Sequence, residues 1–306
     1  MPLDFEVIVY MTNAALPLIS IVLPVYNSGK TLGACLQCLQ KQTYPNLEIV
    51  AVYLASEDDT LAKLQAFSGR SLRIVYQQEK NGPGGARNLG VEAAKGAYIG
   101  FMEADDIVPS DFYEQLFTCI HKEQSDIAVG VTLSQGKPMG QPGAGVVKGF
   151  SPSFSRLPHG GCFDKLFKAE LIKPLRFAEN CRWEDNPFIL QAFWRARQVS
   201  FTPLARYTYM PSLWSANYYR KLQEDLFTVA RPMMDFICQQ PQATSRDKAW
   251  VKRKICDWMG NPFLIEPGVY PRLSALLGHP LFLKVRYYRL RFKQFRHKFY
   301  RRKKHD

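Results

Sequence analysis

Short apolar segments alternate with amphipathic segments from residue 19 to residue 132, and this alternation constrains the fold more than any other feature of the chain. The apolar segments are rich in β-branched residues, which is typical of strands buried on both faces of a sheet. The segments between them repeat apolar residues at helical spacing. The expected strands are residues 19–26, 47–54, 72–77, 97–103 and 126–132, and the expected helices are residues 30–42, 59–67, 85–95 and 109–122. Strands and helices in this order predict an α/β fold with a mostly parallel sheet and flanking helices.

The connections and the second half of the chain give three further predictions. Gly96 is expected to cap the helix that ends near Lys95, because glycine suits the left-handed conformation common after a helix. Residues 136–149 are rich in Gly, Pro and Gln and are expected to form a mobile loop. From about Asn217 the pattern is helical, so we expect a first domain at residues 18–215 and a helical C-terminal region at residues 216–306.

Polar residues follow four of the expected strands. They are Tyr26-Asn27, residues 54–58, residues 77–81 and residues 103–106. Ligands of parallel sheets bind beyond the carboxyl ends of the strands, where such segments meet. We therefore expect these four segments to surround one crevice.

The segment LPVYNSGKT, from Leu23 to Thr31, ends like a phosphate-binding P-loop. The first glycine of that motif would fall at Pro24, and proline has no backbone N–H and a fixed φ angle. A phosphate cradle built from successive N–H groups cannot close around such a residue in the usual way. The sequence therefore disfavours a P-loop, and Gly29-Lys30-Thr31 is expected to begin the next helix.

Carboxylates follow directly after the fourth expected strand, in the segment GFMEADDIVP. Glu103 and Asp105 alternate along the chain, so on an extended backbone both side chains point to the same side. Carboxylates held side by side repel each other unless a cation lies between them, and Mg²⁺ or Mn²⁺ would satisfy them and could bridge a diphosphate. The same acids could instead cap the next helix and face solvent, and the local sequence leaves both interpretations open.

Several segments, taken in their order and spacing, resemble the family 2 glycosyltransferases, whose GT-A fold is Rossmann-like. The segments are ISIVLPVYNSGKTL, QEKNGPGGARNLG, AKGAYIGFMEADD and WEDNPF. The similarity is dense over residues 19–113 and patchy over residues 162–209. It implies an inverting hexosyltransferase of the bacterial surface-polysaccharide type. Such an enzyme moves a sugar from a nucleotide-sugar, expected to be a UDP-sugar, to a glycan or lipid-linked acceptor.

The resemblance implies which residues bind the nucleotide-sugar. Pro24, Val25 and Tyr26 would border its nucleoside, and Arg87 would lie near the base or the pyrophosphate, where a guanidinium suits phosphate oxygens. Without the resemblance, Arg87 could equally be an arginine on the surface of a helix.

The resemblance also implies a metal site and a general base. Glu103-Ala104-Asp105 occupies the position of the family's Asp-x-Asp motif, with Ala104 and Asp105 beside the donor and Asp105 as the expected direct ligand of Mn²⁺ or Mg²⁺. Asp185 matches the general base, which would deprotonate the acceptor hydroxyl. Glu184 and Asp185 could instead be acids that favour the start of a helix.

Leu54 departs from the family pattern, in which an aspartate at this position bonds the uracil or ribose. Leucine accepts no hydrogen bond, so polar base edges would be left unpaired. Glu57 or Asp58 could substitute, the base preference could differ, or donor binding could be lost. The last possibility gives an alternative hypothesis, a catalytically degenerate GT-A scaffold that acts as a binding protein.

Two further residues near the expected acceptor side have weaker functional interpretations. Lys165, in CFDKLF, recurs at a similar place in the family but could simply pair with Asp164. His159 lies in the turn-forming segment PHGGC, and a lone histidine is usually structural.

Composition bears on the location of the protein. Cys35 and Cys38 are the closest of the seven cysteines, but a zinc site would need a second Cys pair or a nearby His, and neither is present. Buried reduced thiols are the expected state and favour a cytoplasmic compartment. The segment after residue 280 carries most of the net charge: the last 23 residues hold +10 of the total +13. Apolar residues recur there at helical spacing, namely Leu281, Val285, Tyr288, Phe292, Phe295 and Phe299.

A basic amphipathic helix with an aromatic face is typical of a segment that lies on an anionic membrane. We therefore expect residues 280–304 to hold the protein peripherally at the inner face of the cytoplasmic membrane. The aromatic face could instead pack on the rest of the chain, or the segment could bind nucleic acid. We expect no nucleic-acid partner, because residues 1–283 carry only +3 and show no nucleic-acid motif.

Overall fold

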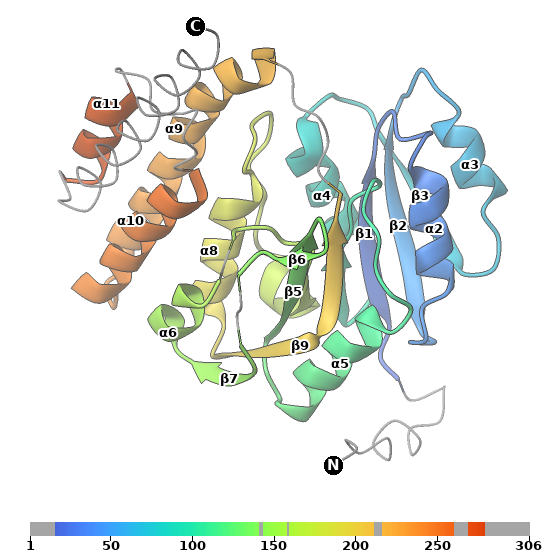
Figure 1. Cartoon of the computed structure of the whole chain (residues 1–306), viewed down its shortest axis with the longest axis horizontal. Coiled ribbons are helices and arrows are strands. Elements are labelled where there is room, and N and C mark those ends of the chain that lie inside the picture. Colours follow the sequence, from blue (N-terminus) through green and yellow to red (C-terminus); the bar gives the residue numbers. More distant parts are fainter. Residues whose placement is uncertain (1–15, 141–142, 158, 211–215, 260–268, 279–306) are drawn as a thin grey trace, which may run out of the picture. The chain divides into compact units, whose positions relative to one another are not determined.

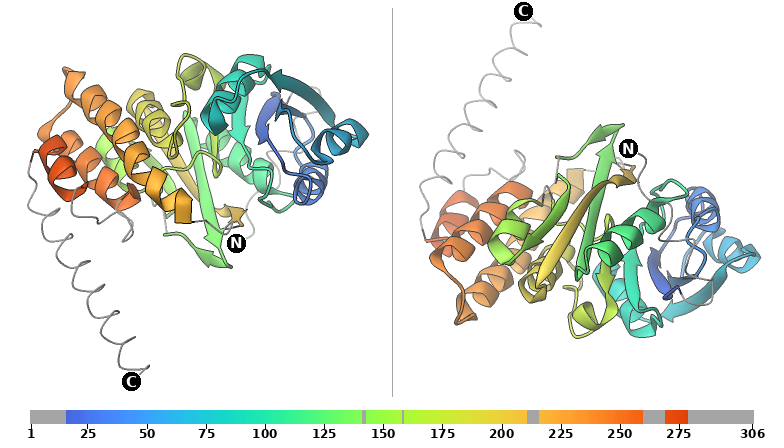
Figure 2. Two further views of the ribbon diagram at one scale, coloured as in Figure 1. Left: turned by 90° about the horizontal axis from the view of Figure 1, so that it is seen from above. Right: turned by 90° about the horizontal axis from the view of Figure 1, so that it is seen from below.

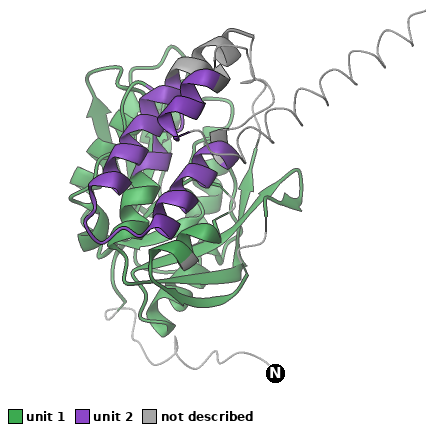
Figure 3. Ribbon diagram, turned by 90° about the vertical axis from the view of Figure 1, so that its left-hand side faces the viewer, with its two compact units in different colours: residues 1–180, 188–212 green, residues 181–187, 213–306 purple. Residues whose placement is uncertain are grey.

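The computed structural model describes residues 16–140, 143–157, 159–210, 216–259 and 269–278. The chain divides into two compact units, which are coloured separately in Figure 3. The first unit comprises Met1–Asn180 and Phe188–Ser212, and the second comprises Cys181–Pro187 and Leu213–Asp306. This division does not test the expected domain bounds, residues 18–215 and 216–306, which remain a prediction.

The first unit is built on a nine-stranded mixed sheet with the order β3-β2-β1-β4-β8-β5-β9-β7, in which β6 pairs with β5. The first four strands of this order run parallel to one another, and β8 is antiparallel to both of its neighbours. The strands are β1 (Ile19–Val25), β2 (Leu47–Leu54), β3 (Ser71–Gln77), β4 (Tyr98–Phe101), β5 (Ile127–Ser134), β6 (Lys137–Pro138), β7 (Gly145–Lys148), β8 (Lys165–Lys168) and β9 (Gln198–Tyr209).

Helices lie on both faces of the sheet (Figures 1 and 2). They are α2 (Leu32–Gln40), α3 (Thr60–Ala66), α4 (Gly82–Ala93), α5 (Phe112–Lys122), α6 (Phe150–Ser155), α7 (Ala169–Ile172) and α8 (Asp185–Arg195). The apolar sides of α2 and α5 form one large core with alternate residues of β1 and β2. On the other face, Val50 and Val52 of β2 pack against Ala86 of α4. Because both faces are covered, β1 and β2 are apolar along almost their whole length, as predicted.

The second unit contains the helices α9 (Ala216–Gln239), α10 (Ser245–Met259) and α11 (Val269–Leu276). Both α10 and α11 pack against α9, and the guanidinium of Arg272 lies 4.1 Å from the ring centroid of Phe227. The predicted helical C-terminal region is confirmed for these residues, whereas the predicted membrane segment 280–304 lies outside the described residues. Among the described helices, none is both long enough and apolar enough to cross a membrane.

Two local predictions were wrong. Gly96 does not cap α4, which ends at Ala93 and is followed by Ala94 in an extended conformation. Gly96 instead allows the backbone of residues 18–20 to pass close by, since a Cβ at position 96 would lie 2.7 Å from the Leu18 carbonyl oxygen and from the Ser20 nitrogen. Residues 136–149 are not simply a loop, because they contain β6 and β7, which pair with β5 and β9.

Candidate functional site

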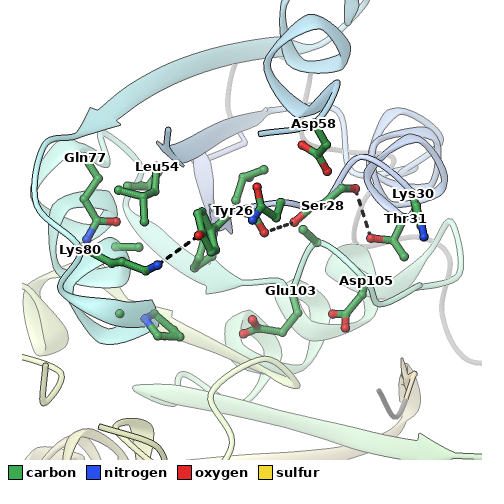
Figure 4. Close-up of a pocket in the computed structure, with 18 residues that line it drawn as sticks. Tyr26, Ser28, Lys30, Thr31, Leu54, Asp58, Gln77, Lys80, Glu103 and Asp105 are labelled. Atoms are coloured by element: carbon green, nitrogen blue, oxygen red, sulfur yellow. Dashed lines mark hydrogen bonds between the residues drawn. The ribbon is translucent and has the colours of Figure 1, made fainter. Parts of the chain in front are cut away.

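A cavity of about 710 Å³ opens at the carboxyl ends of the parallel strands of the first unit (Figure 4). Its walls come from the ends of the parallel strands and the segments that follow them. They are the end of β1 and the turn after it, Leu54 at the end of β2 with Asp58 beyond it, Gln77 at the end of β3 with Lys80 beyond it, and the segment Glu103–Asp105 after β4. The four segments that were expected to form one crevice are therefore brought together.

The end of β1 contributes Pro24, Val25 and Tyr26 to this cavity. Tyr26 is 42% exposed, and its hydroxyl accepts a hydrogen bond of 3.1 Å from Lys80 Nζ, which also lies 4.9 Å from the ring centroid. An exposed aromatic ring at the mouth of a cavity can stack on a planar ligand. The structure thus places these three residues where a nucleoside could lie beside them.

Gly29-Lys30-Thr31 leads into α2, as predicted, and does not form a phosphate cradle. The Gly29 N–H donates to Asp58 Oδ2 at 2.8 Å, so the nitrogen that a P-loop would offer to a phosphate is already paired. The N–H groups of Thr31 and Leu32 both donate to the Ser28 carbonyl, which is the first turn of the helix.

Asp58 was one of the residues expected to replace the missing acid at Leu54. Its carboxylate accepts hydrogen bonds from the Gly29 N–H, the Thr60 N–H and the Thr60 hydroxyl. The hydrogen bonds from Thr60 and Gly29 lower the pKa of Asp58. Asp58 lines the cavity, but its carboxylate is already hydrogen-bonded to the loop that it stabilises.

Glu103 and Asp105 both face the cavity (Figure 4). Burial raises the pKa of the Asp105 carboxyl, and the neighbouring charge of Glu103 raises it further. These are oxygen donors of the kind that hard divalent cations prefer. The described residues contain no cluster of three or more His, Cys, Asp or Glu side chains that could hold a metal by themselves.

Arg87 contacts Glu103, which lines the cavity. The residue lies on α4, is 4% exposed, and is not one of the residues that line the cavity. Its guanidinium lies 2.6 Å from Glu103 Oε1 and 5.5 Å from the ring centroid of Phe177. Arg87 is thus not a surface arginine, and its predicted role near the base or the pyrophosphate remains a prediction.

Asp106 is a residue whose role the sequence did not reveal. Its side chain is fully buried, and it accepts hydrogen bonds from the Tyr207 hydroxyl at 2.6 Å and from the Met210 N–H at 2.7 Å. Burial raises its pKa to about 7, although these two hydrogen bonds oppose the shift. The Tyr207 hydroxyl also accepts from the Glu103 N–H, so Asp106 and Tyr207 fix the turn that carries the two cavity carboxylates. No local pattern could have indicated this, because the partners lie about a hundred residues apart.

Lys165 and Asp164 form a fully buried ion pair at 2.5 Å, so the structural interpretation of Lys165 is confirmed. Lys165 Nζ also donates to the Gly161 carbonyl, while Asp164 Oδ2 lies 3.2 Å from His159 Nε2. Burial acts to raise the pKa of Asp164, but the charge of Lys165 and the contact with His159 outweigh it and hold the pKa well below its usual range. His159 is part of this network and not an isolated side chain.

Asp185 is the first residue of α8 and belongs to the second unit. A carboxylate in the first turn matches the positive end of the helix dipole. This position is compatible with both interpretations given above, and catalysis by Asp185 remains a prediction.

The fold is that of α/β domains in which helices cover both faces of a mostly parallel sheet. S. aureus TarS, solved in complex with UDP-GlcNAc, matches 90% of this chain and 88% of its own with a TM-score of 0.69 at 19% identity. Glucosyl-3-phosphoglycerate synthase from Mycobacterium tuberculosis, solved with Mn²⁺, uridine diphosphate and phosphoglyceric acid, matches 76% of this chain and 82% of its own with a TM-score of 0.56 at 17% identity. At these identities the likeness concerns the fold alone, and it confirms the predicted GT-A fold.

Sequence comparison identifies the family. Residues 20–149 match the family model described as Glycosyl transferase family 2. The poly(ribitol-phosphate) beta-glucosyltransferase of Bacillus spizizenii is 32% identical over 208 residues, which cover 63% of this chain and 32% of that protein. The chain spans less than two thirds of the length of the curated relatives it matches. Residues 20–149 therefore carry a family 2 glycosyltransferase domain.

Proposed function

We propose that this chain transfers a hexose from a UDP-sugar to a glycan or lipid-linked acceptor, with inversion at the anomeric carbon. The observation that carries the proposal is that one cavity holds the segment Pro24–Tyr26 together with the carboxylates of Glu103 and Asp105. The UDP-GlcNAc bound to TarS supports a uridine donor in a fold of this kind. The relative from B. spizizenii, whose name describes glucosylation of a poly(ribitol-phosphate), supports a role in polysaccharide biosynthesis.

The cavity acids suit Mn²⁺ or Mg²⁺. Such ions are often held by one or two carboxylates together with the phosphates of the substrate. Asp105 fits this role, because no ion pair to it occurs among the described residues and its pKa is raised by burial and by Glu103. When bound, the cation would neutralise charge that develops on the departing nucleoside diphosphate. The Mn²⁺ found with uridine diphosphate in the M. tuberculosis synthase supports this assignment.

The other residues are assigned roles that follow from their positions. Pro24, Val25 and Tyr26 would border the nucleoside, and Arg87 would hold Glu103 in the orientation that the diphosphate site needs. Asp185 would take the proton from the acceptor hydroxyl as that oxygen attacks the anomeric carbon from the side opposite the leaving group.

The first test is the thermal stability of the protein with uridine diphosphate, in the presence and absence of Mn²⁺. Ligand at about a hundred times its dissociation constant should add roughly 2.7 kcal/mol to the free energy of unfolding and raise the melting temperature. Asp105→Ala should abolish the shift that depends on Mn²⁺. Glu92→Ala is the matched control, since Glu92 is an exposed acid that pairs with Arg176 and does not line the cavity.

The general base needs a separate assay. Asp185→Asn should lose transfer activity by two or more orders of magnitude while uridine diphosphate binding is kept. An Asp185→Asn protein with full activity would contradict the assignment of Asp185 but leave the donor site intact.

Leu54 favours one alternative, a GT-A scaffold that binds a partner without catalysis. The alternative predicts that no nucleoside diphosphate or nucleotide-sugar shifts the melting temperature of the folded wild-type protein, with or without Mn²⁺. A shift that disappears in Asp105→Ala would exclude a scaffold that has lost donor binding, and sugar transfer by the wild-type protein would exclude a scaffold without catalysis.

The remaining part of the proposal concerns location. We propose that residues 280–304 hold the protein at the inner face of the cytoplasmic membrane, where a lipid-linked acceptor would be found. The support is the sequence of that segment, with its basic residues and its aromatic face.

A further inference from the structure

The family resemblance leads us to expect an acid at position 54 that binds the nucleobase, and the cavity has none there. Leu54, the last residue of β2, lines the cavity and its side chain offers no hydrogen bond. The residue opposite it in the parallel register is Gln77, the last residue of β3. The two side chains lie next to each other at the same edge of the sheet (Figure 4).

The loop after Leu54 does not replace the missing acid. Asp58 is held by Gly29 and Thr60, as described above. The backbone N–H of Glu57 donates to Asn27 Oδ1 at 3.0 Å, and Glu57 is not among the residues that line the cavity. The polar group for a base must therefore come from elsewhere in the wall.

Gln77 offers such a polar group. It lines the cavity although its side chain is only 8% exposed, and its Nε2 has no hydrogen-bond partner among the residues that the structure describes. A buried amide left unpaired costs stability, so such groups are rare unless water or a ligand satisfies them. Gln78, the next residue, is exposed to solvent.

The surroundings of Gln77 suit a flat, partly apolar ligand. Val52, Leu54 and Ala86 provide apolar walls beside the amide. Tyr26 provides an exposed ring, and Lys80 is held against that ring by its hydrogen bond to the hydroxyl. A nucleobase needs this combination of apolar faces and a polar group aimed at its edge.

We propose that the Gln77 amide binds the edge of the donor's nucleobase and takes over the recognition that a carboxylate at position 54 would have provided. The inference rests on the proposed donor site. Uracil presents N3–H beside a carbonyl oxygen, and a primary amide offers one acceptor beside one donor, so two hydrogen bonds can form. Rotation about the last bond of the side chain exchanges Oε1 and Nε2, so either order of donor and acceptor can be presented.

The test compares Gln77→Met with Gln78→Met by titration calorimetry. Methionine keeps nearly the volume of glutamine but cannot donate or accept as the amide does. Uridine diphosphate with Mn²⁺ is the probe for the whole nucleotide, and inorganic pyrophosphate with Mn²⁺ is the probe without a base. Gln77→Met should raise the dissociation constant of uridine diphosphate about tenfold and leave that of pyrophosphate within about twofold. Gln78→Met should change neither.

A second pair of variants keeps the test valid if Gln77→Met does not fold, and it also tests whether lost affinity can be restored. In the Gln77→Leu background, Leu54→Asp supplies an acceptor from the neighbouring strand and should recover part of the lost uridine diphosphate affinity. If Gln77→Met and Gln77→Leu both bind uridine diphosphate like the wild type, the role of Gln77 is overturned. An equal loss for pyrophosphate would overturn it as well, because the effect would not pass through the base.

The two proposals fail in different ways. A wild-type protein that binds pyrophosphate with Mn²⁺ but gains nothing from the nucleoside keeps the metal–phosphate site and loses the base-binding role of Gln77. A wild-type protein that binds neither probe overturns the donor site, and the role of Gln77 with it.

Discussion

Arg87 and Glu103 form an ion pair at 2.6 Å in which the arginine is buried and the glutamate is partly exposed to the cavity. Because of this ion pair, Glu103 and its neighbour Asp105 differ in their charged partners. Glu103 is paired with Arg87, whereas Asp105 has no ion pair among the described residues, which is why we propose Asp105 as the direct ligand of a cation. The two acids of the motif therefore lie in different electrostatic surroundings.

Arg87→Met should destabilise the protein by about 2–3 kcal/mol, because it removes charged hydrogen bonds and leaves Glu103 uncompensated beside Asp105. Urea unfolding of Arg87→Met, Glu103→Gln and the double variant measures the coupling between the two residues. Additive effects of the two substitutions would show that the ion pair contributes nothing to stability.

Asp126 offers a prediction about pH. It accepts hydrogen bonds from Lys168 Nζ at 2.9 Å and from the Arg197 N–H at 2.8 Å. Burial acts to raise the pKa of Asp126, but the hydrogen bonds from Arg197 and Lys168 prevail and lower it. Because the pKa in the folded state lies below that in the unfolded state, the stabilisation is complete above about pH 5 and is lost as the pH falls through the folded-state value.

Asp126→Asn should accordingly cost about 1–3 kcal/mol at pH 7 and progressively less below about pH 4. Denaturant unfolding of both proteins across this pH range measures the difference. A cost that stays constant down to pH 2 would be incompatible with the lowered pKa.

At the scale of elements, the close packing of α4 on β1 depends on a glycine. Gly90 faces Val22, and a Cβ at position 90 would lie 2.3 Å from Val22 Cγ1. The helix therefore approaches the sheet more closely than a side chain would permit. This approach sets the position of the helix that carries Arg87 and whose first turn borders the cavity.

Gly90→Ala should destabilise the protein by about 1–3 kcal/mol, because the helix must move away from the sheet. Gly33→Ala is the control, since Gly33 lies in α2 with nothing within 4 Å of an added Cβ, and it should stabilise by about 0.5–1 kcal/mol. The measurement is the midpoint of thermal or urea unfolding. If Gly90→Ala and Gly33→Ala were both more stable than the wild type, the close contact at Gly90 would be refuted.

At the scale of the whole molecule, the net charge of +13 is concentrated at one end of the sequence. The segment 280–304 lies outside the described residues, so its proposed role is argued from sequence. Each basic residue near an anionic surface contributes about 1 kcal/mol, and the attraction weakens as salt is added.

Deletion of residues 280–304 should therefore abolish sedimentation of the protein with vesicles that contain anionic lipid, and should leave uridine diphosphate binding unchanged. Vesicles of neutral lipid are the control for the full-length chain. If the truncated chain sediments as well as the full-length chain does, the segment is not the membrane contact.

The sequence by itself determined the local elements and the order of the motifs. The bounds of β2 and the buried side of α2 follow from apolar periodicity, because burial on one or two faces imposes that period on the chain. The cavity at the strand ends followed as well, since parallel strands joined by helices must bring their carboxyl ends together.

Only the tertiary structure decided how individual polar groups are paired. The contact of Arg87 with Glu103, the bond between Tyr207 and Asp106 and the juxtaposition of Leu54 with Gln77 join residues that are distant along the chain. Periodicity reports whether a residue is buried and not which partner it meets. For a buried charge or amide the partner decides whether the group stabilises the fold, binds a ligand or does neither.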